Sequence, residues 1–195
     1  MPEKLEKKRR VLELGFALGL ALTVLLTALA AHRRRVADRV CADTVRLHIL
    51  ANSDTLEDQL LKLQVRDAIL QALPETVLQA DDTAEAEAAL RQALPALHLA
   101  AQRALYKAHS PQTARLRLEQ LDFAVRDYGS FTLPGGRYTA LRVELGEAKG
   151  HNWFCVLYPA LCVSGAQAEY PTREENALVF GRYEVRLAVV DAVKN

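Results

Sequence analysis

The sequence has few reactive residues and none of the short motifs that mark the common enzyme classes. Three of its 195 residues are cysteine, one is tryptophan and 6% are aromatic. GxSxG, HExxH, P-loop and Asp-Ser/Thr-Gly signatures are absent, and neither cysteine nor histidine occurs at CxxC or HxxxH spacing. We therefore expect a protein that is not an enzyme, with no catalytic residue, no metal, no cofactor and no small-molecule substrate.

An excess of positive charge is also missing from the body of the chain. The formal net charge is +1, but eight of the 25 Lys and Arg and three of the 24 Asp and Glu precede residue 36. The rest of the chain therefore has 17 basic and 21 acidic residues, a net charge of −4. It also lacks a basic patch interleaved with aromatic residues, so we expect no nucleic acid partner.

The chain does contain a long apolar run near its start. Residues 11–31 are apolar apart from Glu13, two glycines and two threonines, and about 20 such residues are enough to cross a hydrocarbon core as a helix. The basic segment 1–10 favours a cytoplasmic N-terminus. Ala28-Leu29-Ala30 resembles a signal peptidase site, so the run is either an uncleaved transmembrane signal anchor or a signal peptide. Residues 36–195 then form a single extracytoplasmic domain.

Strand-like and helix-like periodicities follow one another through residues 36–195, which predicts an α+β domain. We expect a mostly antiparallel sheet with two to three packed helices, preceded by the N-terminal transmembrane or signal helix. Helices are expected at Leu56–Leu73 and at 82–108, the second with a kink or a division at Pro95. Strands are expected at Thr44–Ala51, Arg115–Val125, Tyr138–Leu145 and Trp153–Tyr158.

Three further segments have weaker or mixed patterns. The apolar positions change parity at Glu119-Gln120, which predicts a β-bulge or a break in the strand there. Residues 164–176 have no periodicity and are expected to form an irregular loop. Residues 183–193 fit a strand and a helix equally well, so both alternatives stay open.

The segment Gly146–Cys162 concentrates unusual residues, among them His151, Trp153 and Cys155. Outside the cytoplasm, two cysteines seven positions apart with a proline between them favour a disulfide between Cys155 and Cys162 over two reduced thiols. The spacing of His151 from these cysteines fits no metal-ligand pattern.

A cysteine nucleophile is the alternative chemistry for this segment. A histidine four positions before Cys155 in a strand would lie roughly 13 Å away, too far to act as its base. His48 is the other candidate base, so an envelope thiol or cell-wall hydrolase using Cys155 and His48 is the alternative function. The simpler interpretation of His48 is a half-buried histidine. The simplest interpretation of Arg46 and Arg142 is that their side chains are solvated or are partners of Glu144.

Two blocks of the sequence carry a more specific signal. The first comprises Arg46–Asp54, Asp58-Gln59 and Lys62–Asp67, and the second comprises Ala140–Val143, Gly146-Glu147 and Gly150–Cys162. Both blocks resemble signatures of the stage II sporulation protein R family, in the same order and at the same separation. The sequence departs from the family pattern only within the second block, at Ala148, Phe154, Tyr158 and Ala160.

The resemblance implies signalling during sporulation. Family members are exported from the forespore into the space between two membranes, where they activate a membrane-embedded aspartic protease of the mother-cell membrane. That protease processes the precursor of sigma-E. We expect this chain to be anchored in the membrane or released into the intermembrane space. The residues expected to bind the partner are Arg46, His48, Asn52, Asp54, Arg142, His151, Asn152 and Trp153.

Overall fold

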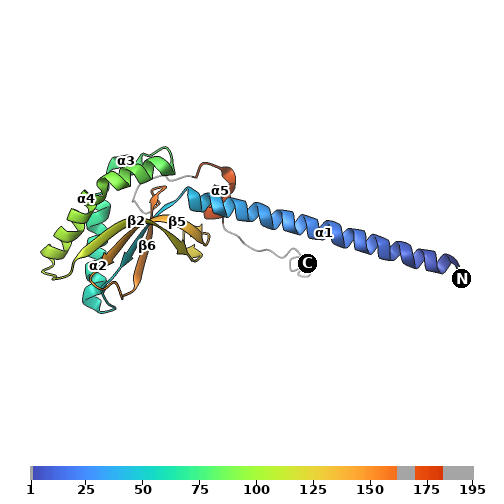
Figure 1. The fold of residues 1–195 in the computed structure, drawn as a ribbon, viewed down its shortest axis with the longest axis horizontal. Coiled ribbons are helices and arrows are strands. Elements are labelled where there is room, and N and C mark those ends of the chain that lie inside the picture. Colours follow the sequence, from blue (N-terminus) through green and yellow to red (C-terminus); the bar gives the residue numbers. More distant parts are fainter. Residues whose placement is uncertain (1, 162–169, 182–195) are drawn as a thin grey trace, which may run out of the picture.

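The computed structural model of the protein describes residues 2–161 and 170–181. Figure 1 shows one long helix, α1 (Pro2–Ala42), that projects from a body in which helices lie along one side of a sheet. The other helices are α2 (Leu56–Gln71), α3 (Glu75–Leu78), α4 (Thr83–Lys107) and α5 (Arg173–Phe180). The strands are β1 (Val45–Leu50), β2 (Ala114–Phe123), β3 (Arg126–Asp127), β4 (Thr132–Leu133), β5 (Gly136–Leu145) and β6 (Asn152–Tyr158). The predicted α+β class with an N-terminal apolar helix is confirmed.

Helix α1 contains the predicted apolar segment and continues beyond it. Over Glu6–Ala42 it is long and apolar enough to cross a membrane, with a mean hydropathy of 2.2 in its apolar window and none of that window buried. Its last two turns belong to the folded body, because Val36, Val40 and Cys41 are buried there. The helix therefore enters the domain without a break.

The main sheet has the strand order β2-β5-β1-β6. Two of its three pairings, β2 with β5 and β1 with β6, are antiparallel as predicted, whereas β1 and β5 are parallel. A parallel pair needs a crossover connection, and the chain through α2, α3 and α4 supplies most of it. The core lies between these helices and the sheet, where Val45, Leu47 and Ile49 of β1 are fully buried.

Strand β2 contradicts the predicted β-bulge or break. Its register with β5 is continuous from Ala114 opposite Leu145 to Phe123 opposite Gly136. The apolar positions change parity because the strand contributes to both faces of the sheet. Leu116 packs on the helix-covered core, whereas the Phe123 ring lies on the opposite face, against the side chains described below.

A second, smaller core covers one end of the opposite face of the sheet. Val40 of α1, Leu133 of β4, Val156 of β6 and Val179 of α5 are buried in it. The irregular loop predicted at 164–176 is wrong from Arg173 on, where helix α5 begins, and its residues 164–169 lie outside the described residues. Helix α5 begins with a capping box: the Thr172 side chain accepts from the Glu175 N–H, and the Glu175 side chain accepts from the Thr172 N–H. The segment 183–193, predicted as strand or helix, lies outside the described residues.

Helix α4 runs through Pro95 as one element, so the predicted division into two helices is wrong. Pro95 is exposed, which places its ring and the missing backbone donor on the side of the helix away from the core. The helix is fixed at its start by the Asp82 side chain, which accepts a hydrogen bond from the Glu85 backbone N–H at 2.8 Å.

Candidate functional site

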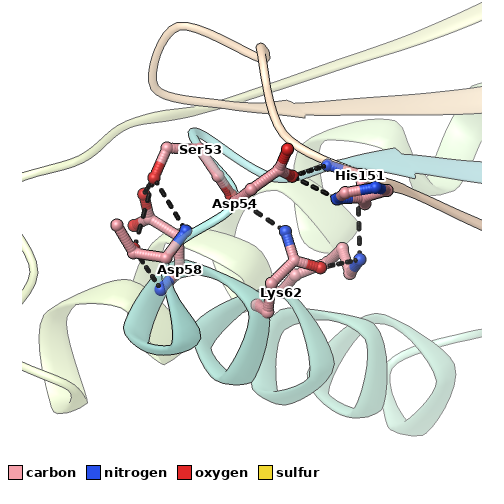
Figure 2. A network of polar contacts seen from close by, with 7 residues as sticks. Ser53, Asp54, Asp58, Lys62 and His151 are labelled. Carbon is pink, nitrogen blue, oxygen red and sulfur yellow. Dashed lines mark hydrogen bonds and ion pairs between the residues drawn. The ribbon is translucent and has the colours of Figure 1, made fainter.

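The two blocks that carry the family resemblance meet at one edge of the sheet. Strands β1 and β5 are parallel, so the loop after β1 and the loop from β5 to β6 leave the sheet on the same side. We call residues 51–58 and 146–151 together the paired-loop site, and Figure 2 shows its polar contacts. Residues 97 positions apart in the chain are hydrogen-bonded there.

Main-chain hydrogen bonds join the two loops. The Gly150 N–H donates to the Ala51 carbonyl at 2.9 Å, and the Lys149 N–H donates to the Asn52 carbonyl at 3.1 Å. The Asn52 side-chain oxygen also accepts from the Glu147 N–H at 2.9 Å. The second loop is therefore aligned along the first by backbone donors, which requires the two chains to approach closely.

That close approach explains two glycines of the second block. Gly146 has a φ of +55°, and a Cβ there would lie 2.3 Å from the Asn52 Oδ1 atom. A Cβ on Gly150 would lie 2.2 Å from the main-chain oxygen of Ser53. A side chain at Gly150 requires the loops to separate, whereas one at Gly146 would have to displace the Asn52 side chain and adopt a strained positive φ.

The carboxylate of Asp58 holds the first loop in place through hydrogen bonds. It is 8% exposed and accepts hydrogen bonds from Ser53 Oγ at 2.5 Å, from Asn52 Nδ2 at 2.8 Å and from the Gln112 side-chain amide. Asp58 also lies in the first turn of α2, whose N-cap Thr55 accepts from the Asp58 N–H. Burial raises the pKa of this carboxyl group, but the hydrogen bonds to its charged form outweigh burial, and the pKa lies below its ordinary value.

We expect acid to weaken the fold through Asp58. A carboxyl group with a lowered pKa in the folded state contributes stability that is complete above its unfolded pKa of about 3.9. That contribution is lost as the pH falls through the lower folded pKa. Urea unfolding of the full chain in detergent should therefore show a loss between pH 5 and strong acid that is smaller in Asp58→Asn. Equal pH profiles for the two proteins would contradict this role.

The outer side of the paired-loop site carries an exposed, hydrogen-bonded pair, Asp54 and His151. The Asp54 carboxylate accepts from the His151 N–H at 2.6 Å and also contacts His151 Nδ1. Their side chains are 54% and 78% exposed. Beneath them, Lys62 is 5% exposed and donates to the His151 carbonyl at 2.9 Å. Burial lowers the pKa of Lys62. A buried donor thus holds the loop, and the pair above it is free to meet solvent or a partner.

Arg46 does not lie where the sequence predicts. The alternation of β1 predicts a solvated side chain, but Arg46 is fully buried on the face of the sheet opposite the helices. Its guanidinium lies 4.0 Å from the centre of the Phe123 ring and 4.8 Å from that of Tyr138, and it donates to the Tyr128 hydroxyl at 2.8 Å. Its Nε and Nη1 atoms have no hydrogen-bond partner among the residues that the structure describes. The prediction of a solvated Arg46 is wrong.

His48 and Asn152 are adjacent on that same face. His48 Nε2 lies 2.9 Å from Asn152 Oδ1, and the imidazole stacks on the Phe154 ring with the two centres 4.7 Å apart. Burial, together with the nearby charges of Arg142 and Arg46, lowers the pKa of His48 despite its bond to Asn152. The predicted half-buried histidine is confirmed.

Arg142 and Trp153 lie on different sides of the sheet. Arg142 forms ion pairs with Glu144 at 2.9 Å and with Glu119 at 3.4 Å, which confirms the predicted partnership with Glu144. Trp153 packs instead against the helix-covered core, and the guanidinium of Arg66 lies 4.6 Å from the centre of its ring. Two of the eight predicted partner-binding residues, Arg142 and Trp153, therefore cannot share one contact surface.

Of the three cysteines, the structure describes Cys41 and Cys155. Cys155 is 3% exposed in the helix-covered core, and Cys162 lies outside the described residues, so a disulfide between them stays a prediction. His48 pairs in register with Phe154, the neighbour of Cys155, so the His48 and Cys155 side chains project from opposite faces. Cys41 is a buried free thiol, and burial raises its pKa.

Sequence reasoning missed the residues that hold the paired-loop site together. Asp58 and Lys62 belong to the first block, but each has a partner far away in the sequence: Gln112 donates to Asp58, and Lys62 donates to the His151 carbonyl. Gln112 lies outside both blocks and carries no signal of its contact with Asp58. Among residues 2–161 and 170–181, no group of three or more His, Cys, Asp and Glu is placed to hold a metal ion.

Comparison with known proteins connects this geometry to a family. A family model described as stage II sporulation protein R matches residues 41–168. Stage II sporulation protein R of Bacillus subtilis (strain 168) is 36% identical over 118 residues, which cover 60% of this chain and 53% of the relative. The chain thus spans about half the length of that relative, and no solved structure matches it at a significant level. Because the family match includes well over half of the chain and both loops of the paired-loop site, the chain belongs to the stage II sporulation protein R family.

Proposed function

We propose that this protein is a sporulation signalling protein, exported from the forespore, that activates a membrane-embedded aspartic protease in the mother-cell membrane. The protease then processes the precursor of sigma-E. One observation carries the proposal: the two blocks typical of the family fold into one paired-loop site, whose outer surface is the exposed pair Asp54 and His151. The buried parts of both blocks hold that surface in place.

The arrangement of these residues supports binding over catalysis. A thiol hydrolase would need a base beside Cys155, but His48 projects from the other face of the sheet. The hydroxyl of Ser53 donates to Asp58 and not to the exposed histidine. The envelope hydrolase is therefore the weaker candidate.

Helix α1 supports the proposed location. Its exposed apolar length fits a membrane anchor or a signal segment, and the basic residues before it favour a domain outside the forespore cytoplasm. In that compartment the disulfide between Cys155 and Cys162 belongs to the proposal, and mass spectrometry of the non-reduced protein would detect it.

The exposed pair provides the direct test. We expect Asp54→Ala to reduce processing of the sigma-E precursor in sporulating cells by at least about tenfold, since a central contact of an interface often costs that much. Its cost in stability should stay below about 1 kcal/mol, because both side chains of the pair are exposed. Immunoblots of the precursor and of this protein measure both quantities.

The matched control is Glu75→Ala, which removes an exposed carboxylate from α3, outside both blocks. It should leave processing and accumulation at wild-type levels. Normal processing with Asp54→Ala would contradict the proposal, as would an equal loss with Glu75→Ala. A variant that fails to accumulate would be replaced by Asp54→Asn, which keeps the shape of the side chain and one oxygen acceptor.

A further inference from the structure

A hollow of about 200 Å³ lies on the open face of the sheet, next to the small core described above. Its polar lining includes His48, Asn152 and Arg126, and its aromatic walls are Phe123 and Phe154. Pockets for drug-sized ligands usually measure about 300–1,000 Å³, so this hollow has the size of one or two side chains. It is therefore suited to an anchoring residue of a protein partner.

Two positive charges beside the hollow lack a counter-charge. The guanidinium of Arg126 lies 4.1 Å from the centre of the Phe154 ring, and that of Arg46 lies behind Phe123. Among the described residues, no carboxylate lies within ion-pair distance of either. Asp122 is the acidic residue of the lining, and it pairs with neither arginine. The electrostatic field in the hollow therefore favours an anion.

Hydrogen-bonding capacity in the hollow is also unused. The Asn152 side-chain oxygen accepts from His48 Nε2, so the other nitrogen of the ring, Nδ1, is an acceptor and does not serve a carboxylate. The Asn152 amide nitrogen takes part in no side-chain hydrogen bond among the described residues. This amide donor and the Arg126 guanidinium both line the hollow, a combination that suits a carboxylate.

The surface beyond the hollow continues the same charge. Arg117, Arg142 and His48 are in register across β2, β5 and β1, on the face that also carries Phe154 of β6. Arg117 is exposed and has no ion pair among the described residues, whereas Arg142 is neutralised by two glutamates. An extended segment leaving the hollow along this row would pass over further positive charge.

We propose that the hollow binds an aspartate or glutamate side chain from an acidic segment of the protein partner. The carboxylate pairs with Arg126 and accepts from Asn152, while its methylene groups pack on Phe154. The segment continues across the sheet towards Arg117. This inference deepens the proposed function, since it names the chemistry by which the activated protein is recognised.

The hollow is tested with small probes on the full chain in detergent micelles. N-acetyl-glutamate N-methylamide is titrated while NMR follows the His48 ring and the Arg126 side chain, and N-acetyl-glutamine N-methylamide is the neutral control. We expect saturable shifts with the glutamate probe and an affinity at least about tenfold lower for the glutamine probe. Arg126→Gln should lower the glutamate affinity by about tenfold, and Arg103→Gln, on exposed α4 surface, should not change it. Equal affinities for the two probes, or an unaffected Arg126→Gln, would overturn the proposal.

A cellular arm separates this inference from the proposed function. Arg126→Glu should abolish processing of the sigma-E precursor while the protein accumulates, and Arg103→Glu should leave processing normal. If the glutamate probe binds but cells with Arg126→Glu process the sigma-E precursor normally, the hollow is not the partner site. The inference then fails, although the proposed function stands. If Asp54→Ala and Arg126→Glu both process normally, the proposed function fails as well.

Discussion

Gly150→Ala is expected to separate the two loops of the paired-loop site. The new methyl group would lie 2.2 Å from the Ser53 oxygen and 2.5 Å from the Ser53 carbonyl carbon, and neither main-chain atom can turn aside. Relief of such a contact typically costs about 1–3 kcal/mol, which lowers the melting temperature of a domain of this size by roughly 3–10 °C. We also expect processing of the sigma-E precursor to disappear, because the Gly150–Ala51 hydrogen bond that holds the exposed pair is lost.

The control is Gly129→Ala, in the loop between β3 and β4. That glycine has a φ of +85°, but a Cβ there would meet nothing within 4 Å. Only the backbone strain of a left-handed residue remains, which is about 1 kcal/mol. Thermal unfolding of both variants, with precursor immunoblots, makes the comparison. A Gly150→Ala protein as stable and as active as Gly129→Ala would show that the loops are not held as described.

The second large effect is expected at Arg46, where two substitutions distinguish the contribution of the charge to stability from that of the side-chain volume. Arg46→Ala removes a fully buried side chain from between aromatic rings and should cost about 3 kcal/mol or more. Arg46→Met fills most of the same space and removes the need to desolvate a charge that has no counter-ion within the described part of the chain. Its stability should therefore lie within about 1.5 kcal/mol of the wild type.

Urea unfolding of the full chain in detergent measures both variants. If Arg46→Met were as unstable as Arg46→Ala, the stacking of the cation on Phe123 and Tyr138 would have to supply the missing stability. That outcome would contradict the prediction. Tyr128→Phe removes only the hydroxyl that accepts the Arg46 hydrogen bond, so it measures the contribution of that bond to stability separately.

The strands and the helix-covered core were predictable from local periodicity. The alternation of Val45, Leu47 and Ile49 places one side of β1 in the core, and the structure has all three fully buried. The alternation failed for Arg46, because a charged residue is read as solvated unless its surroundings are known. Those surroundings are Phe123 of β2, Tyr128 between β3 and β4, and Tyr138 of β5, which lie 77 to 92 positions away in the sequence. Burial by distant segments leaves no local pattern.

The candidate site was predictable in its residues but not in its geometry. Asn52 and Asp54 were named from the first block and His151 from the second, and the structure brings all three into one site. Trp153 was grouped with them, but its position in β6 turns its side chain towards the helices. A shift of one position along a strand reverses the face, and sequence order alone does not show which face a partner meets.

Helix α1 is continuous from its apolar segment into the folded body. The apolar run ends at residue 31 and Val36 is the next buried residue of the helix, so four residues, or about 7 Å of helix, separate the two. If residues 11–31 span a membrane as proposed, the domain stands directly on the bilayer surface with a fixed tilt. Its encounter with a partner would then be a search in two dimensions at a set height, and insertion of a flexible linker before Val36 would change the encounter rate without altering any contact.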